Sequence, residues 1–432
     1  MINYLCILKG YIYSIYLSRK TVKGGDMNLS SRYTIMIITL FLFGAVIQTP
    51  VEAEQFKFTY RVGEKYKVLS EVEEEVYING VFSHQAAILN RISVEVKDVR
   101  DQAGLLEGTF ITSERRSGQV SVYELKNSYY SSFWRDSRGR YDIDPSYYMP
   151  VVRNVPIFPE GDIKTGENWK EPGEEVHDLR NGYGIPVPLR LPFRANYRYL
   201  GKAGYKGKEY DLISVQYTVR HRTSDYFSRF SIYPVRISGF SDQQVFWDSE
   251  AGRPHAYSEQ FSMIFSLSTG DEYEFTGTAR AEITESVPMD RARIAEEVQK
   301  RIEEDGVEDT RVSIDDRGVT INLENIQFAP DSVDLLPGEV EKLKRVADIL
   351  KKYPNRHLLV TGHTAMAGTP EGRQRLSDER ARTVGQFLLE LGIRKSDEVM
   401  TVGKGATEPV ADNSTPEGMR RNRRVEITIL EN

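Results

Sequence analysis

Residues 358–364 read Leu-Leu-Val-Thr-Gly-His-Thr, an apolar run that ends in a glycine and two polar side chains. The first three residues, Leu358-Leu359-Val360, predict a short buried strand. A helix is expected before this strand, over residues 337–350, because Pro337 suits a first helical position and apolar residues follow at helical spacing. A second helix is expected after the strand and stops at Gly392. This alternation of strand and helix predicts a compact α/β unit of βαβ type.

The segments on either side of this unit extend it. Asp290 can cap a helix over residues 289–304, which is expected to link the unit to the preceding part of the chain. A β-hairpin is expected next, with one strand on either side of Asp315-Asp316-Arg317-Gly318. Further strands are expected at residues 399–402 and 425–430. The C-terminal third of the chain therefore predicts a small sheet with helices packed on it.

Several short motifs follow one another in this region, and together they resemble a known family. They are Phe328-Ala329-Pro330-Asp331-Ser332, Gly362-His363-Thr364, Gly368-Thr369, Leu376-Ser377 with Arg380-Ala381, and Pro409-Val410-Ala411-Asp412-Asn413 with Asn422-Arg423-Arg424-Val425. In this order they resemble the OmpA-like peptidoglycan-binding domain. The fold that the resemblance implies, a small mixed sheet with helices on one face, agrees with the pattern described above.

The resemblance implies non-covalent binding to the diaminopimelate of the peptidoglycan stem peptide. In the family, an Asp after Gly-His-Thr takes the ammonium group of this zwitterion, and an Arg in the Leu-Ser-x-x-Arg-Ala helix takes the carboxylate, to which a guanidinium is well matched. The Arg is present as Arg380, but Ala365 stands at the Asp position, and Arg373 stands where the family has Asn. The site residues that the resemblance implies are Arg380, Arg423, Thr364, Gly368, Arg373 and Ala365.

The change at Ala365 leaves two interpretations open. Losing one charged hydrogen-bond partner costs about 1.5 to 3 kcal/mol, or roughly ten- to a hundredfold in affinity. In the first interpretation Arg380 and Arg423 still hold an anion, and binding of the ammonium end is weakened or altered. In the second, the domain keeps the fold, has lost peptidoglycan binding, and serves as a protein-interaction module.

Residues 54–288 are expected to form a β-rich domain, and no family motif is recognised in them. Apolar and polar residues alternate over Ile213–Val219, and Asn79-Gly80 lies between two runs of β-formers, which predicts a hairpin. This pattern fits a soluble sandwich or barrel and also a barrel in an outer membrane. The soluble form is favoured because charged residues fall within expected strands. They are Glu73, Glu75, Asp211, Arg229 and Glu259.

A long irregular stretch, residues 127–205, is rich in Pro, Gly and aromatic residues. Its aromatic rings, interleaved with Arg135, Arg138 and Arg140, could stack on sugars. The favoured interpretation is that they fill a core beneath a long loop.

The N-terminus predicts a secretory leader. Residues 35–47 are apolar or small, Arg32 precedes them, and Val51 and Ala53 stand three and one residues before an expected cleavage after Ala53. An uncleaved anchor is the less favoured alternative, because about 20 apolar residues are needed to span a bilayer. Translation is expected to start at Met27, so residues 1–26 would form an upstream extension that is not made.

Composition excludes several classes of function. The net charge of -6 argues against nucleic acid as a partner. The single cysteine, Cys6, allows no disulfide framework, and the six His show no metal-binding spacing. No motif for a catalytic nucleophile, phosphate loop or dinucleotide fold is present, so neither an enzyme, a cofactor nor a metal is expected.

The sequence therefore predicts an α+β protein in the periplasm of a diderm bacterium, associated with its cell wall and outer membrane. Its expected function is structural: contact with peptidoglycan through the OmpA-like domain, and a link to an outer-membrane protein or lipid partner. The expected order is an upstream extension at 1–26, a signal peptide at 27–53, a β-rich domain at 54–288, a linker helix and hairpin strand at 289–317, and the OmpA-like domain at 318–432.

Overall fold

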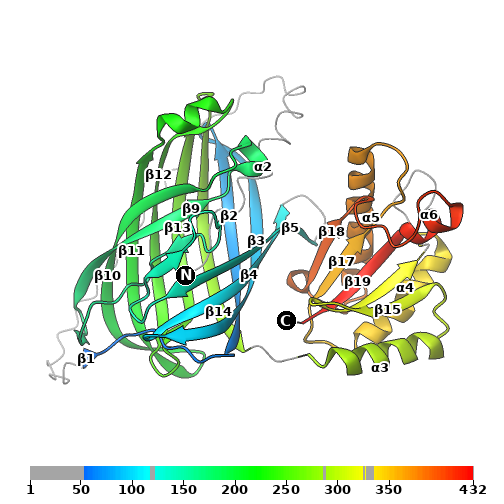
Figure 1. Ribbon diagram of the computed structural model, residues 1–432, viewed down its shortest axis with the longest axis horizontal. Coiled ribbons are helices and arrows are strands. Elements are labelled where there is room, and N and C mark those ends of the chain that lie inside the picture. The colour runs from blue at the N-terminus through cyan, green and yellow to red at the C-terminus, as the bar shows by residue number, and fades with distance from the viewer. Residues whose placement is uncertain (1–52, 117–121, 286–288, 325, 327–334, 432) are drawn as a thin grey trace, which may run out of the picture.

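The computed structural model describes residues 53–116, 122–285, 289–324, 326 and 335–431 (Figure 1). A large β-rich part and a smaller part of mixed helices and strands lie side by side. This arrangement confirms the expected α+β class. The expected leader, apart from its last residue Ala53, and the Phe328–Ser332 motif lie outside the described residues.

The β-rich part is one curved antiparallel sheet. The strands β2 to β5 pair in chain order, β9 to β14 do the same, and β14 pairs with β2 to join the two series. The sheet curls round its own core, so the barrel-like alternative holds rather than the sandwich (Figure 1). Its main strands are β2 (Lys65–Ile78), β3 (Val81–Arg100), β4 (Ala103–Arg116), β5 (Tyr123–Arg135), β9 (Asn168–His177), β10 (Leu189–Tyr205), β11 (Lys208–Arg222), β12 (Pro234–Asp248), β13 (Arg253–Leu267) and β14 (Glu272–Glu285). The short ones are β1 (Ala53–Glu54), β6 (Tyr141–Ile143), β7 (Val152–Arg153) and β8 (Ile163–Lys164).

The expected alternation and hairpin are both confirmed. Ile213, Val215 and Tyr217 on β11 are buried in the core, while Gln216 between them is exposed. Asn79-Gly80 makes the turn between β2 and β3, where both residues have positive φ, 52° and 75°. Such φ values are those that a tight hairpin turn requires and that Asn and Gly tolerate.

Aromatic side chains fill the interior of the sheet. Phe158, from the irregular stretch, is fully buried and lies edge-on to Trp247 of β12 at a ring distance of 4.7 Å. Arg135 lies over the ring of Phe58, 4.1 Å from its centre. Packing in the core, the favoured interpretation, therefore accounts for most of these rings, and Arg135 is engaged there rather than at a sugar site.

The charged residues expected within strands differ in their positions. Arg229 lies not in a strand but in a short 3-10 helix, η1 (Asp225–Arg229), so that expectation was wrong. Asp211 and Glu259 are in strands but are buried, and they accept hydrogen bonds from the hydroxyl groups of Tyr199 and Ser241. The interior of this sheet therefore carries polar networks as well as aromatic rings.

Glu74 on β2 is the least compensated of the buried charged residues. Its side chain is 2% exposed, and neither carboxylate oxygen has a hydrogen-bond partner among the described residues. Burial, and then the negative charge of Glu114, raise the pKa of Glu74 well above its ordinary value. A carboxyl with a raised pKa stabilises the fold at pH values below its unfolded pKa, and this contribution is lost as the pH rises towards the folded pKa.

We therefore expect Glu74→Gln to stabilise the protein at pH 7.5 by about 2 kcal/mol, because the amide needs no proton to stay neutral. The gain should shrink as the pH falls to 4, below the ordinary pKa of Glu, where the carboxyl is mostly protonated in both the folded and the unfolded state. Urea unfolding at the two pH values measures this, with the exposed neighbour changed in Glu73→Gln as the control. An equal effect of Glu74→Gln at both pH values would contradict the assignment.

The C-terminal part has the sheet order β15-β16-β19-β17-β18, with β17 and β18 parallel and the other pairs antiparallel. The expected helices and strands are confirmed, and the side chain of Asp290 accepts a hydrogen bond from Arg293 N at the start of the first helix. The elements are α3 (Arg291–Glu304), β15 (Thr310–Ile314), β16 (Gly318–Glu324), α4 (Pro337–Leu350), β17 (Leu358–Gly362), α5 (Pro370–Glu390), β18 (Val399–Gly403), α6 (Pro416–Asn422) and β19 (Arg424–Leu430).

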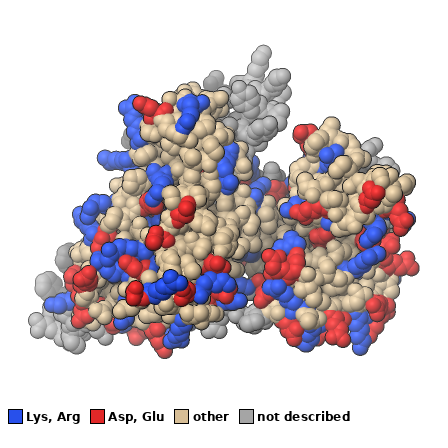
Figure 2. All heavy atoms as spheres, viewed as in Figure 1, with Lys and Arg blue, Asp and Glu red and all other residues tan. Residues whose placement is uncertain are grey.

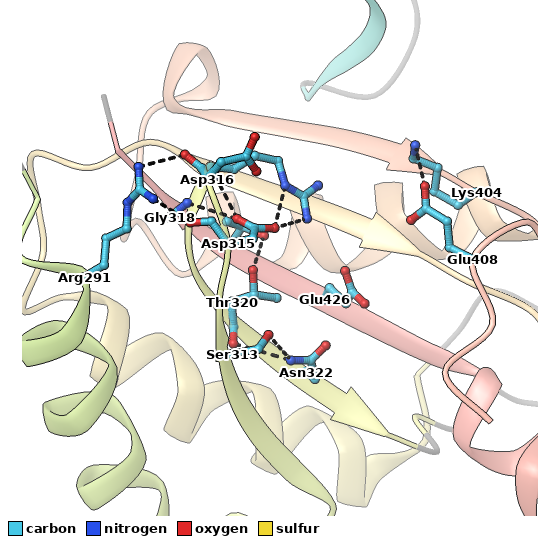
Figure 3. A network of polar contacts seen from close by, with 12 residues as sticks. Arg291, Ser313, Asp315, Asp316, Gly318, Thr320, Asn322, Lys404, Glu408 and Glu426 are labelled. Carbon is cyan, nitrogen blue, oxygen red and sulfur yellow. Dashed lines mark hydrogen bonds and ion pairs between the residues drawn. The ribbon is translucent and has the colours of Figure 1, made fainter.

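Arg291, at the start of α3, forms hydrogen bonds with the β15–β16 turn of this sheet, as Figure 3 shows. Its guanidinium donates to the carbonyl oxygens of Asp315 and Asp316 in the β15–β16 turn, at 2.9 Å each, and to the carboxylate of Glu431 at 2.6 Å. The carboxylate of Asp315 in turn accepts from Gly318 N at 3.1 Å, which holds the turn in shape.

The two parts of the chain also share a sheet. The beginning of β5 pairs in parallel with β18, with Tyr123 opposite Met400 and Glu124 opposite Thr401. An apolar cluster of Ala87, Leu89, Tyr123, Leu359 and Met400 lies across the junction. The β-rich part therefore packs directly on the C-terminal sheet.

None of the helices in the described ranges has the length and apolar character required to cross a bilayer.

Candidate functional site

Helix α5 lies directly against the ends of β17 and β18 because two glycines face it. Gly362 and Gly403 are opposite each other in the strand pairing. A Cβ atom at Gly362 would lie 2.2 Å from the carbonyl oxygen of Ser377, and one at Gly403 would lie 2.3 Å from Asp378 N. The glycine of the Gly362-His363-Thr364 motif thus sets the position of the helix that carries Arg373 and Arg380.

Two loops meet beside the N-terminal half of α5, and asparagines hold them together. Met366 N donates to Asn413 Oδ1 at 3.0 Å, and the Asn422 amide donates to the same oxygen at 2.9 Å. Asn422 Oδ1 accepts from Val410 N at 2.8 Å and from Ala411 N at 3.0 Å. The loop after β17 and the loop before α6 therefore form one fixed rim.

Thr364 and Ala365 stand at the base of this rim. Thr364 N donates to the carbonyl oxygen of Gly405 at 2.8 Å. The Thr364 hydroxyl is buried and makes no hydrogen bond within the part of the chain that the structure describes. Ala365 is 4% exposed and offers only a methyl group at the position that the family uses for a carboxylate. This side of the site can donate one hydrogen bond but has no negative charge from residue 365.

Arg380 and Arg423 form the positively charged side of the site. Burial, and then the positive charge of Arg423, lower the pKa of Arg380. Two guanidinium groups close enough to repel each other favour an anion between or beside them. Arg373 lies two turns before Arg380 on the same face of α5 and donates to the carbonyl oxygen of Gly368 at 2.5 Å. The structure thus joins Arg373 to Gly368, and Arg380 and Arg423 are near enough for their positive charges to interact.

The neighbouring His363 and Arg424 have a different role. Both are buried, with His363 Nε2 3.3 Å from Arg424 Nη2 and 3.5 Å from the carboxylate of Glu426. Burial would raise the pKa of Glu426, but His363 and Arg424 lower it to about 2. This buried cluster joins β19 to the end of β17, so the Arg424 side chain is engaged there and not at the candidate site.

The sequence analysis missed two residues on the other side of α5. Asp378 Oδ1 accepts from Gly403 N at 2.7 Å, and Gln374 Nε2 donates to the carbonyl oxygen of Gly403 at 2.8 Å. Their spacing of four residues, next to the Leu-Ser motif, is the signal that places them on one face of the helix.

Comparison with known proteins shows which family the C-terminal domain resembles. A sequence model of the OmpA family matches residues 327–423. The peptidoglycan-binding protein ArfA of Mycobacterium tuberculosis is 40% identical over 104 residues, which cover 24% of this chain and 32% of the relative. The probable lipoprotein YiaD of Escherichia coli is 38% identical over 136 residues, which cover 31% of this chain and 62% of the relative.

Among solved structures, the cell wall anchor of the type VI secretion system from Pseudomonas aeruginosa is 29% identical, with a TM-score of 0.28, and the match covers 33% of this chain and 99% of that one. The chain spans about a third of the length of the first curated relatives it matches.

Proposed function

We propose that this protein, whose C-terminal domain belongs to the OmpA family, is a non-catalytic envelope protein that contacts peptidoglycan through that domain. Its place would be the periplasm, between the cell wall and the outer membrane of a diderm bacterium. The β-rich domain would link the wall to an outer-membrane protein or to lipid. Relatives named as a peptidoglycan-binding protein and a lipoprotein support this placement.

The observation that carries the proposal is the pair of guanidinium groups of Arg380 and Arg423. Both match motif positions of the family, and their positive charges interact, so an anion bound there would reduce the repulsion between them. The anion that the family binds is the carboxylate of diaminopimelate. A forked guanidinium can hold such a carboxylate through two parallel hydrogen bonds.

The ammonium end of the ligand would be held differently here than in the family. Ala365 provides no charge for it, and Arg373 adds a positive charge nearby. We propose a site that selects for the carboxylate and tolerates a neutral or masked amine. A second candidate function, a protein-interaction module without wall affinity, is favoured by the same substitution at Ala365.

Co-sedimentation of the full chain with purified sacculi tests the proposal. Arg380→Ala should weaken binding about ten- to a hundredfold, since one charge-assisted contact is lost. Arg375→Ala, an exposed arginine on the same helix, should leave binding unchanged. Ala365→Asp should strengthen binding to sacculi that carry free diaminopimelate amines.

The outcomes separate the two functions. Binding by the wild type that Arg380→Ala removes and Arg375→Ala keeps would support the wall contact. Binding that appears only in Ala365→Asp would instead support the interaction module. Equal binding by wild type and Arg380→Ala would contradict the proposed site.

A further inference from the structure

Positively charged side chains cover the outer face of β9 to β12, which we call the basic face. Side chains in a strand alternate between its two faces, so every second residue of these strands points away from the core. In Figure 2, Lys and Arg side chains project from the left side of the β-rich part, where Figure 1 places β10 and β11. Six exposed cations define the face: Lys170, Arg194, Arg198, Arg220, Arg222 and Arg236.

The protein itself does not neutralise this charge. Within the part of the chain that the structure describes, none of the six cations forms an ion pair. Two acidic side chains on the same face are already engaged: Glu174 pairs with Arg190 at 2.8 Å, and Asp242 accepts a hydrogen bond from Gln216 at 2.9 Å. The whole chain has a net charge of -6, so the excess of positive charge is local to this face.

Two of the arginines face each other across neighbouring strands. Arg222 and Arg236 are directly opposite in the pairing of β11 with β12, and both are exposed. Arg236 donates a long hydrogen bond of 3.5 Å to Ser266 Oγ. Like charges directly opposite on one face of a sheet repel each other. An anionic group bound by the two guanidiniums removes this repulsion, so the pair points to a negatively charged partner.

Exposed apolar side chains lie among the cations. Phe240 on the outer side of β12 is 46% exposed, and Leu200 on the outer side of β10 is 40% exposed. Tyr226 in η1 is also 40% exposed, and the guanidinium of Arg229 lies over its ring, 3.3 Å from the centre. Arginines beside aromatic rings suit the headgroup region of a bilayer, where the cation meets phosphate and the ring meets the apolar boundary.

This arrangement favours a lipid surface over an acidic protein. A protein interface has a well-packed core from which charged residues are depleted. On the basic face, β11 separates Leu200 from Phe240, and β11 itself carries Arg220 and Arg222 on its outer side. Anionic lipids present many equivalent phosphates, and each arginine near such a surface adds to the attraction.

We infer that the basic face docks on a membrane that contains anionic lipids, with its arginines on the phosphate groups and Phe240 and Tyr226 in the headgroup region. The inference rests on the proposed place of the protein beside the outer membrane, and it selects lipid from the two partners proposed for the β-rich domain. It does not depend on the Arg380 site, which lies in the other domain. The β-rich domain holds the membrane, and the C-terminal domain contacts the wall.

Co-sedimentation of the full chain with vesicles tests the inference. Vesicles of phosphatidylglycerol and phosphatidylcholine should bind the wild type, and vesicles of phosphatidylcholine alone should not. The double variant Arg222→Gln/Arg236→Gln should weaken binding about tenfold or more. It should still fold, because it removes a repulsion. The matched control, Lys57→Gln/Arg61→Gln, removes the same charge at exposed positions beside the β12–β13 turn, at the other end of β12, and should keep the binding.

Phe240→Ala separates a lipid surface from an acidic protein. It should weaken vesicle binding about threefold or more, because an apolar contact with the bilayer is lost. Binding to poly-glutamate, a soluble polyanion, should not change. Poly-glutamate that binds as tightly as the vesicles, with no effect of Phe240→Ala on either, would assign the face to an acidic protein and overturn the inference. A wild type that does not bind vesicles, or an equal loss in Lys57→Gln/Arg61→Gln, would also overturn it.

Purified sacculi distinguish this inference from the proposed wall contact. Arg380→Ala should weaken binding to sacculi and keep binding to vesicles, whereas Arg222→Gln/Arg236→Gln should do the reverse. If the wild type binds sacculi but not vesicles, the inference is wrong and the wall contact stands. If it binds vesicles but not sacculi, the wall contact is wrong and the membrane contact stands.

Discussion

Trp247→Ala should lower the free energy of unfolding of the β-rich domain by about 4 kcal/mol. The Trp247 ring is fully buried and lies edge-on to Phe58 at 4.9 Å and to Phe158 at 4.7 Å. These two neighbours are far apart in the sequence and meet at this ring. A curved sheet surrounds them and cannot close on the space left behind, so most of the cavity cost should remain.

Urea unfolding of the full chain, followed by far-ultraviolet circular dichroism, measures this loss. Phe240→Ala is the matched control, because Phe240 lies on the same strand and is 46% exposed. Its effect should stay below about 1 kcal/mol. A loss for Trp247→Ala no larger than that of Phe240→Ala would mean that the interior is not packed round this ring.

The strands of the β-rich domain could be predicted because their signals are local. Alternation over Ile213–Val219 and the Asn79-Gly80 turn each lie within a few residues, and both are observed. The same rule could have found the buried Glu74. In the run Val72-Glu73-Glu74-Glu75-Val76 the middle Glu shares its face with both valines, so period two places it inside.

The filling of the interior could not be predicted in the same way. Phe158 belongs to a stretch without periodicity, and its contact with Trp247 joins residues far apart in sequence. Only the proportion of aromatic residues indicated a core, not which rings would meet. In the candidate site, likewise, the family motifs indicated Arg380 and Arg423. The hydrogen bonds of Asn422 could not be predicted, because they depend on two loops that meet only in the folded chain.

One feature of the sequence could have indicated where the two domains pack together. Residues Ala86–Asn90 of β3 are buried without interruption, so both faces of that strand are covered. A strand of a sheet with one face in water would alternate instead. The apolar run Ala86-Ala87-Ile88-Leu89 thus marks where the C-terminal sheet packs on the outside of β3. The run alone does not show which part of the chain covers it.

Arg91 of β3 fixes this junction, and its loss should be costly. Its guanidinium donates to His357 Nδ1 at 2.9 Å and to the carbonyl oxygen of Asp397 at 2.5 Å. Burial lowers the pKa of Arg91 to about 10, although the nearby Asp397 acts in the opposite direction, so the side chain stays charged at neutral pH. Arg91→Ala removes both bonds and should weaken the docking of the domains by about 3 kcal/mol.

The expected result of Arg91→Ala is that the two domains unfold separately. All three tryptophans, Trp134, Trp169 and Trp247, lie in the β-rich domain, so their fluorescence reports that domain, whereas most of the helical circular dichroism comes from the other. In the wild type, the two signals should change at the same urea concentration, because docking couples the domains. In Arg91→Ala they should separate, while Arg100→Ala, on the same strand and exposed, should keep them together. Coincident transitions in Arg91→Ala would mean that the apolar cluster and the β5–β18 pairing suffice to hold the domains, and that Arg91 is not the residue that couples them.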